Sequence, residues 1–135
     1  MFLCTGNSCR SQMAEGFARV MGKGKIEAFS AGLMAAGVHP RAVAVMQEIG
    51  IDISLQRSKE IDYELLASMD VVITLCNHAD ESCPVTPPVV TRLHRPVTDP
   101  VGMKGTEQEI MADFRRARDE IGNVLALFIR DRVDR

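Results

Sequence analysis

Short apolar runs alternate with amphipathic stretches along the whole chain. The apolar and β-branched runs predict strands at residues 1–3, 26–30, 71–75 and 89–93. Apolar residues that recur at helical spacing predict helices at residues 11–21, 40–49, 61–69 and 107–128. The last helix has the clearest start, because Thr106 followed by Glu109 predicts a capping box. Strands that alternate with helices are typical of α/β proteins.

The run at residues 71–75 has no polar alternation, which indicates a strand buried on both faces of a parallel sheet. Right-handed connections through helices then cover both faces of that sheet. We therefore predict an α/β fold of three layers, with a four-stranded parallel sheet between two layers of helices. The 135 residues fit a single domain, 1–135, with no visible repeat or linker.

The segment Cys4-Thr5-Gly6-Asn7-Ser8-Cys9-Arg10-Ser11, between the first strand and the first helix, has the composition of an anion-binding loop. Backbone N–H groups of small and polar residues can converge on one point, and Gly6 and Asn7 tolerate the positive φ that such a curl requires. Arg10 adds a planar fork of donors for a tetrahedral oxyanion, and the helix adds its positive end. The predicted substrate-binding residues are Thr5, Gly6, Asn7, Ser8, Cys9, Arg10 and Ser11.

Cys4 lies at the start of this loop, where the donors that hold an anion would also stabilise a thiolate. The sequence therefore predicts Cys4 as a nucleophile beneath a bound oxyanion. The alternative is a small buried cysteine in an ordinary connection between a strand and a helix.

Two further cysteines are expected near Cys4. Cys76 directly follows the strand at 71–75, and the carboxyl ends of parallel strands meet at one rim of the sheet. Residues 77–82 are polar and are predicted to form a mobile loop that lets Cys83 reach the same rim. Three thiols so placed can exchange disulfides in sequence. Two inert cysteines or a zinc site are the alternatives, although the spacing of the cysteines is unusual for zinc.

Asp99-Pro100 follows the fourth predicted strand on the same rim. A carboxylic acid at this place could protonate the oxygen that leaves when Cys4 attacks an oxyanion. An Asp-Pro pair alone is usually a turn. Asp99 is therefore a candidate acid because of its combination with the loop at residues 4–11.

The composition excludes some classes of protein. The net charge of −2 and the pI near 5.9 leave no basic surplus, so we expect no nucleic-acid partner. No apolar run approaches the roughly 20 residues of a membrane span, and no signal peptide is visible, so we expect a cytoplasmic protein without a membrane partner. Four cysteines in such a chain favour catalytic, redox or metal chemistry over a structural disulfide framework.

The opening motif at residues 4–16, together with Thr74-Leu75-Cys76, Cys83-Pro84 and Asp99-Pro100, resembles the thioredoxin-coupled arsenate reductases. These enzymes share the fold of the low-molecular-weight protein tyrosine phosphatases, with the phosphate-binding loop after the first strand. The resemblance covers nearly the whole chain. It implies arsenic detoxification by reduction of arsenate to arsenite, with no bound cofactor or metal, thioredoxin as the reductant and the chain as a monomer.

The resemblance also implies a role for each site residue. Cys4 attacks arsenate held by the loop amides and Arg10, Ser11 keeps the thiol ionised, and Asp99 protonates the departing oxygen. Cys76 then attacks Cys4, and arsenite leaves. Cys83 finally displaces Cys4, and thioredoxin reduces the resulting Cys76–Cys83 disulfide.

Two other functions compete with this interpretation. A low-molecular-weight phosphatase would hydrolyse phosphomonoesters through a phosphocysteine on Cys4. Its substrate slot needs aromatic walls, whereas Val101 and Gly102 follow the Asp-Pro pair and Tyr63 is the only tyrosine. A non-enzymatic module that binds oxyanions or zinc is the third possibility. Since a phosphatase needs one cysteine and an acid, two further thiols on the same rim favour the relay.

Overall fold

The computed structural model describes residues 1–83 and 85–134, and its strands form one parallel sheet. The strands are β1 (Phe2–Cys4), β2 (Ser30–Gly32), β3 (Val71–Thr74) and β4 (Thr91–His94). Their order in the sheet is β2-β1-β3-β4. The connection order reverses between β1 and β3, and ligand sites in open α/β sheets lie at the carboxyl ends of the strands at such a point. Cys4 ends β1, and Cys76 follows β3 by two residues.

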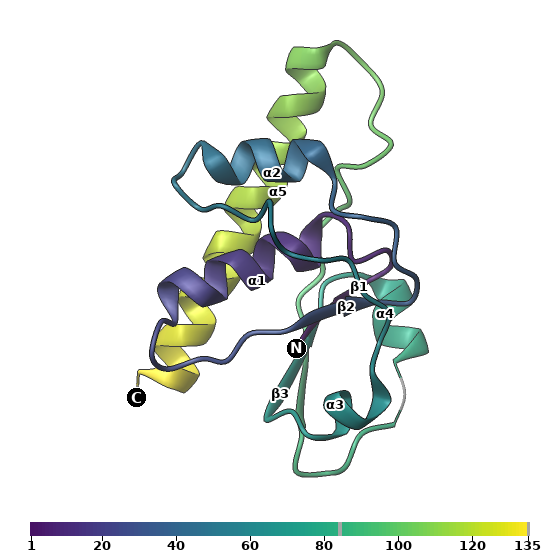
Figure 1. The fold of residues 1–135 in the computed structure, drawn as a ribbon, viewed down its shortest axis with the longest axis vertical. Helices are drawn as coiled ribbons and strands as arrows, with labels where there is room; N and C mark the ends of the chain where they lie inside the picture. Colours follow the sequence, from purple (N-terminus) through teal and green to yellow (C-terminus); the bar gives the residue numbers. More distant parts are fainter. Residues whose placement is uncertain (84, 135) are drawn as a thin grey trace.

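Helices cover both faces of the sheet, as predicted (Figure 1). One face carries α1 (Arg10–Met21), α2 (Pro40–Gln47) and α5 (Glu107–Phe128), with a π-helical turn at Ile129–Val133. The other face carries α3 (Tyr63–Ala67) and α4 (Asn77–Ser82). The predicted α/β fold of three layers is confirmed.

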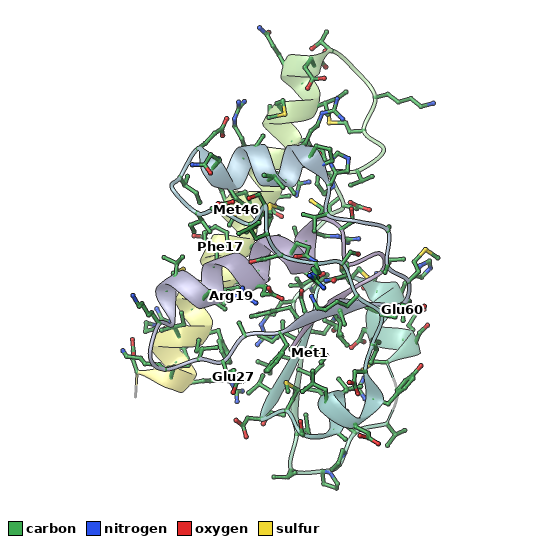
Figure 2. All side chains as sticks on the ribbon, in the orientation of Figure 1. Met1, Phe17, Arg19, Glu27, Met46 and Glu60 are labelled. Carbon is green, nitrogen blue, oxygen red and sulfur yellow. The ribbon has the colours of Figure 1, made fainter. Side chains whose placement is uncertain are left out.

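Phe2 and Leu3 of β1 belong to two different apolar clusters because successive residues of a strand point to opposite faces. Phe2 packs with the α1, α2 and α5 layer, whereas Leu3 packs with the layer of α3 and α4. Phe17 from α1 and Met46 from α2 lie in the first of these clusters (Figure 2). β1 is therefore buried on both of its faces.

Two helix starts follow directly from local sequence. Thr106 Oγ1 accepts from Glu109 N at 3.2 Å, and Glu109 Oε1 accepts from Thr106 N at 3.2 Å, so the predicted capping box is confirmed. Pro40 occupies the start of α2, where a missing N–H leaves no helical hydrogen bond unmade. His39 caps the same helix by accepting from Arg41 N at 3.1 Å.

Two predicted strands are displaced. The prediction of a strand at residues 26–30 is wrong, since β2 comprises Ser30–Gly32, in register with β1 from Phe2 to Cys4. The pairing partner thus decides the position of β2, and the apolar residues before Ser30 only lead into it. The fourth strand begins two residues later than predicted because a turn at residues 88–90 precedes it.

The prediction of a mobile loop at residues 77–82 is also wrong, because these residues form α4. The segment has no apolar periodicity, but its single apolar residue, Ala79, is buried against the sheet. Cys76 caps the helix, with its Sγ accepting from Ala79 N at 3.3 Å.

Every helix in residues 1–83 and 85–134 is too short or too polar to span a membrane.

Candidate active site

The loop after β1 turns its carbonyl groups away from its concave side. The carbonyls of Thr5, Gly6 and Ser8 each accept a backbone hydrogen bond from residues 34–39, at 2.9 to 3.1 Å. A trans peptide directs its N–H opposite to its C=O, so the N–H groups that follow these carbonyls face inward. This is the arrangement that an anion-binding nest requires.

Asn7 provides the left-handed turn of the loop. It has φ 45° and is completely buried. Its Oδ1 accepts from Gln12 Nε2 at 2.9 Å and from the backbone N of Lys59 at 2.8 Å. Two segments outside the loop therefore hold Asn7 in a conformation that few non-glycine residues adopt.

Gly6 does not share this conformation, so the expectation of positive φ at Gly6 is wrong. Instead, Gly32 at the end of β2 is a glycine whose backbone lies close against the backbone of the loop. A Cβ on Gly32 would lie 2.6 Å from the backbone N of Asn7 and 2.8 Å from the carbonyl O of Thr5. The absence of a side chain at Gly32 thus allows β2 to pack directly against the loop.

Cys4 is almost fully buried beneath this loop. Its Sγ lies 2.8 Å from Ser11 Oγ. The Ser11 hydroxyl also accepts from Asn7 Nδ2 at 2.8 Å, so its own proton is free to point at the sulfur. The geometry suits a thiolate that accepts a hydrogen bond from Ser11.

Arg10 and Asp99 meet at the mouth of the loop. The buried guanidinium donates from Nη1 to Val97 O at 3.0 Å, and its Nη2 lies 3.4 Å from Asp99 Oδ2. Asp99 is half exposed, and its other oxygen accepts from Val101 N at 3.0 Å. A carboxyl group is thus held beside the guanidinium predicted to bind the anion.

Cys76 contacts the same loop. Its Sγ lies 3.3 Å from Thr5 Oγ1, next in sequence to Cys4. Cys4 and Cys76 belong to one apolar cluster, and Cys83 packs against that cluster. All three are free thiols. The structure therefore brings the three sulfur-bearing segments to one rim of the sheet.

The remaining thiols differ in their surroundings. Burial raises the pKa of Cys83, while nearby Arg92 opposes the shift. Burial raises the pKa of Cys9 far above its ordinary range, and this residue packs in the core beside α1. Cys9 would thus serve the site through its backbone rather than its thiol. Within residues 1–83 and 85–134, no three His, Cys, Asp or Glu residues gather as metal ligands.

A buried polar network supports the loop and was missed by the sequence reasoning. Glu15 is 2% exposed and accepts from Ser30 Oγ at 2.8 Å. Its carboxylate also lies 2.9 Å from Arg19 Nη2 and 3.7 Å from Lys59 Nζ. The only signal in the sequence was a charged residue within the apolar stretch of the first helix, which is too weak to identify its partners.

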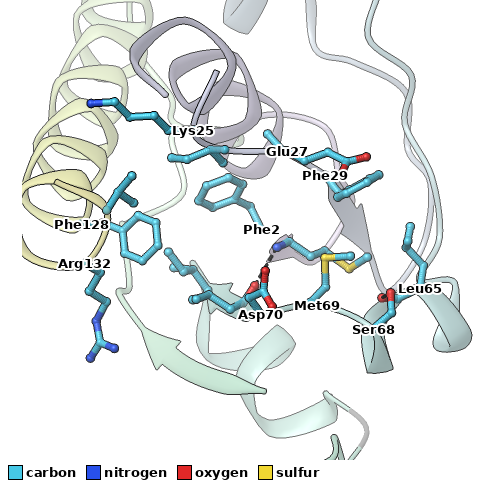
Figure 3. A pocket seen from close by; sticks show the side chains of 16 residues that line it. Phe2, Lys25, Glu27, Phe29, Leu65, Ser68, Met69, Asp70, Phe128 and Arg132 are labelled. Carbon is cyan, nitrogen blue, oxygen red and sulfur yellow. Dashed lines mark hydrogen bonds between the residues drawn. The ribbon is translucent and has the colours of Figure 1, made fainter. Parts of the chain in front are cut away.

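A cavity in the described part of the chain lies away from this site. Its volume is about 590 Å³, and it opens at the amino ends of the strands (Figure 3). Phe2, Phe29, Met69 and Phe128 are among its lining residues, whereas none of the candidate site residues lines it. The predicted chemistry therefore belongs to the shallow loop at the opposite end of the sheet.

Comparisons with known proteins agree with this geometry. The family model for low molecular weight phosphotyrosine protein phosphatases matches residues 1–134. An arsenate reductase from Bacillus subtilis (strain 168) is 53% identical over 127 residues, which cover 94% of this chain and 91% of that protein.

Solved structures show the same likeness. An arsenate reductase in its phosphate-binding state superimposes with a TM-score of 0.76 and 41% identity, covering 96% of this chain and 95% of that one. A thioredoxin-dependent arsenate reductase from Corynebacterium glutamicum has a TM-score of 0.66 and 26% identity, covering 93% of this chain and 60% of that one. The family match includes the loop and all four cysteines.

Proposed function

Because the chain belongs to the low molecular weight phosphotyrosine protein phosphatase family, a family of enzymes, we propose that it reduces arsenate to arsenite by a relay of three cysteines. Cys4 is the nucleophile, Cys76 and Cys83 resolve in turn, and thioredoxin supplies the electrons. The contact of 3.3 Å between Cys76 Sγ and Thr5 Oγ1 carries this proposal, because hydrolysis of a phosphate ester needs no second thiol at the loop. The close arsenate reductase relatives support the same conclusion.

In the first step, the loop N–H groups and Arg10 hold the arsenate oxygens, and the Cys4 thiolate attacks the arsenic. A sulfur–arsenic bond forms, and one oxygen leaves as water. Asp99 is at the mouth of the loop and supplies a proton to that oxygen. Its position 3.4 Å from Arg10 Nη2 places the carboxyl group beside the guanidinium that holds the anion.

In the second step, Cys76 attacks the sulfur of Cys4. The Cys4–Cys76 bond forms, the sulfur–arsenic bond breaks, and its electron pair reduces As(V) to As(III). Cys76 Sγ accepts from Ala79 N and lies 3.3 Å from Thr5 Oγ1, so the attacking sulfur is held beside the residue next to Cys4. Arsenite then leaves the loop.

In the third step, Cys83 attacks Cys76 and expels Cys4 as a thiolate. This exchange requires a change in α4. Cys76 and Cys83 flank this six-residue helix, which separates their Cα atoms by about 10 Å at 1.5 Å per residue. A disulfide needs Cα atoms roughly 4.4–6.8 Å apart, so α4 must unwind before the Cys76–Cys83 bond can form. Thioredoxin then reduces that bond.

All four cysteines are free in the structure, and we place the relay in the reducing cytoplasm, where thioredoxin is available to return Cys76 and Cys83 to thiols. The enzyme acts as a monomer in this scheme, since every residue that the relay uses comes from one chain.

Phosphomonoester hydrolysis is the alternative that the same loop allows. Cys4, Arg10 and Asp99 would suffice for it, and the loop cannot easily distinguish phosphate from arsenate. The residues that follow Asp99 and Pro100 in the sequence are Val101 and Gly102, which offer no aromatic side chain to a phosphotyrosine ring. We therefore expect weak activity on small phosphate esters beside the reductase activity.

A coupled assay with arsenate, thioredoxin, thioredoxin reductase and NADPH tests the proposal. Arsenate-dependent consumption of NADPH is expected. Cys83→Ser should stop multiple turnover but still release one equivalent of arsenite. Ser82→Ala changes the exposed neighbour of Cys83 and should behave like the wild type. Absence of arsenate-dependent NADPH consumption, or continued turnover of Cys83→Ser, would refute the relay.

A further inference from the structure

His94, the last residue of β4, joins α4 to the sheet. Its Nδ1 lies 2.8 Å from Thr74 Oγ1, and its Nε2 lies 2.9 Å from Asn77 Oδ1. The Thr74 hydroxyl lies 3.0 Å from Asp80 Oδ1. Asn77 and Asp80 are three residues apart and share one face of α4. We call His94, Thr74, Asn77 and Asp80 the His94 clasp, because together they hold the first turn of α4 at two points.

The Thr74 hydroxyl is the centre of the clasp. Its Oγ1 lies within hydrogen-bond distance of Asp80 Oδ1, of His94 Nδ1 and, at 3.4 Å, of Leu93 O. Thr74 therefore links His94 to Asp80, and this link is lost when the imidazole withdraws. His94 and Asp80 are 33% and 43% exposed, so water can replace these bonds and the clasp can open reversibly.

The clasp matters because α4 cannot persist by itself. A six-residue helix is far too short to be stable without tertiary contacts. Its other supports are the buried Ala79 and the cap from Cys76 Sγ. That cap is weakened once Cys76 Sγ is bonded to another sulfur, because a disulfide sulfur is a poorer acceptor than a thiolate. The clasp is then the main polar link between α4 and the sheet.

We propose that His94 is a positioning residue that keeps α4 wound while Cys76 attacks Cys4, and that opening of the His94 clasp sets the rate at which Cys83 reaches Cys76. This role rests on the proposed relay. In the step concerned, the Cys83 thiolate attacks Cys76 Sγ, and the Cys76–Cys83 bond forms. The Cys4–Cys76 bond breaks, Cys4 leaves with the electron pair, and the Cys83 proton passes to solvent. No external oxidant or reductant is needed.

Hydrogen exchange of the reduced protein tests the clasp without any arsenate chemistry. His94→Ala is expected to raise the exchange rates of backbone amides in residues 77–83 about tenfold, the effect of losing one or two modest hydrogen bonds. Amides in α1 and α5 should keep their rates. His78→Ala is the matched control, since His78 lies exposed on the same helix outside the clasp. Equal α4 exchange in His94→Ala and the wild type would overturn the proposal.

Asn77→Ala provides a second variant in case the loss of His94 disturbs the sheet. It removes one end of the clasp from an exposed position. A smaller rise in α4 exchange is expected, with the amides of β3 and β4 unchanged. His94→Asn keeps a donor near Thr74 and should restore part of the protection. No change in Asn77→Ala and no recovery in His94→Asn would contradict the clasp.

A quenched single turnover with arsenate tests the timing. Samples are alkylated at intervals, and mass spectrometry follows the Cys4–Cys76 and Cys76–Cys83 disulfides. Conversion of the first disulfide into the second should be several-fold faster in His94→Ala than in the wild type or His78→Ala. Equal conversion rates would overturn the timing role while the relay stands. Absence of both disulfides in the wild type would overturn the relay and the timing role together.

Discussion

Ser11 Oγ lies 2.8 Å from Cys4 Sγ and is held there by Asn7 Nδ2, also at 2.8 Å. The amide of Asn7 occupies the acceptor side of the hydroxyl, so the hydroxyl proton is left for the sulfur. Lys59 N and Gln12 Nε2 hold the other end of Asn7. The position of the hydroxyl beside the thiol thus depends on Asn7 and on the groups that hold Asn7.

Ser11→Ala should slow the alkylation of Cys4 by iodoacetamide at pH 7. Loss of a hydrogen bond to a charged group costs about 1.5–3 kcal/mol, which corresponds to a fall of roughly 10- to 100-fold. Peptide mapping after timed alkylation measures the rate at Cys4 alone. Ser68→Ala is a control, since its hydroxyl donates only to Leu65 O. An unchanged rate in Ser11→Ala would show that the hydroxyl does not stabilise the thiolate.

Asp99→Asn should reduce the hydrolysis of phenyl phosphate about 100-fold, a usual effect of losing a general acid. The loss should be smaller with p-nitrophenyl phosphate, because nitrophenolate leaves without needing a proton. Steady-state rates with the two esters provide the comparison. Asp119→Asn, which changes an exposed carboxylate on α5, should affect neither ester. Equal losses with both esters would argue that Asp99 only orients Arg10.

Gly32→Ala should distort the loop at residues 4–11, although residue 32 lies outside that loop. The new Cβ would lie 2.6 to 2.8 Å from three backbone atoms, at Asn7, Met34 and Thr5, and backbone cannot yield as a flexible side chain can. Overpacking of this kind costs about 1–3 kcal/mol of folding free energy. Urea unfolding followed by circular dichroism measures the loss. Wild-type stability together with wild-type alkylation of Cys4 would show that the loop does not need this close contact.

Because of Glu48, the free energy of unfolding should depend on pH in the acidic range. Hydrogen bonds from Arg115, and also from Arg118, lower the pKa of Glu48 from 4.5 to about 2. A depressed carboxyl pKa stabilises the fold above pH 4.5, and this contribution is lost as the pH falls toward 2. Glu48→Gln should therefore lower the free energy of unfolding at pH 7, and the difference from the wild type should vanish near pH 2.

Urea unfolding at several pH values between 7 and 2 measures this difference. The effect should be small because the ion pair is exposed. Glu27→Gln removes one exposed carboxylate elsewhere and controls for the change of net charge. A difference that stayed constant across the acidic range would rule out the pKa of Glu48 as its cause.

Features that depend on neighbours in sequence could be predicted. The capping box of Thr106 and Glu109 and the start of α2 at Pro40 need only a few adjacent residues. The loop from Cys4 to Arg10 was predictable for the same reason, since its length and small residues leave few ways to connect a strand to a helix. The order of strands and helices followed from the alternation of the two periodicities.

Features that depend on pairing across the chain could not be predicted. The position of β2 is decided by its register with β1. Residues 77–82 form α4, in which Ala79 is buried and the first turn contacts Cys76 and His94. Thr5 and Cys76 are 71 residues apart in the sequence and 3.3 Å apart in space. No local pattern contains such a contact.

The sequence by itself therefore determined the α/β class, the loop from Cys4 to Arg10 and the residue types that this loop carries, because backbone geometry and side-chain chemistry act over a few residues. Tertiary structure alone decided which buried groups orient Cys4, how near Cys76 lies to it, and that α4 separates Cys76 from Cys83. These features depend on how the whole sheet packs, because each contact is set together with many others between residues that are far apart in the sequence.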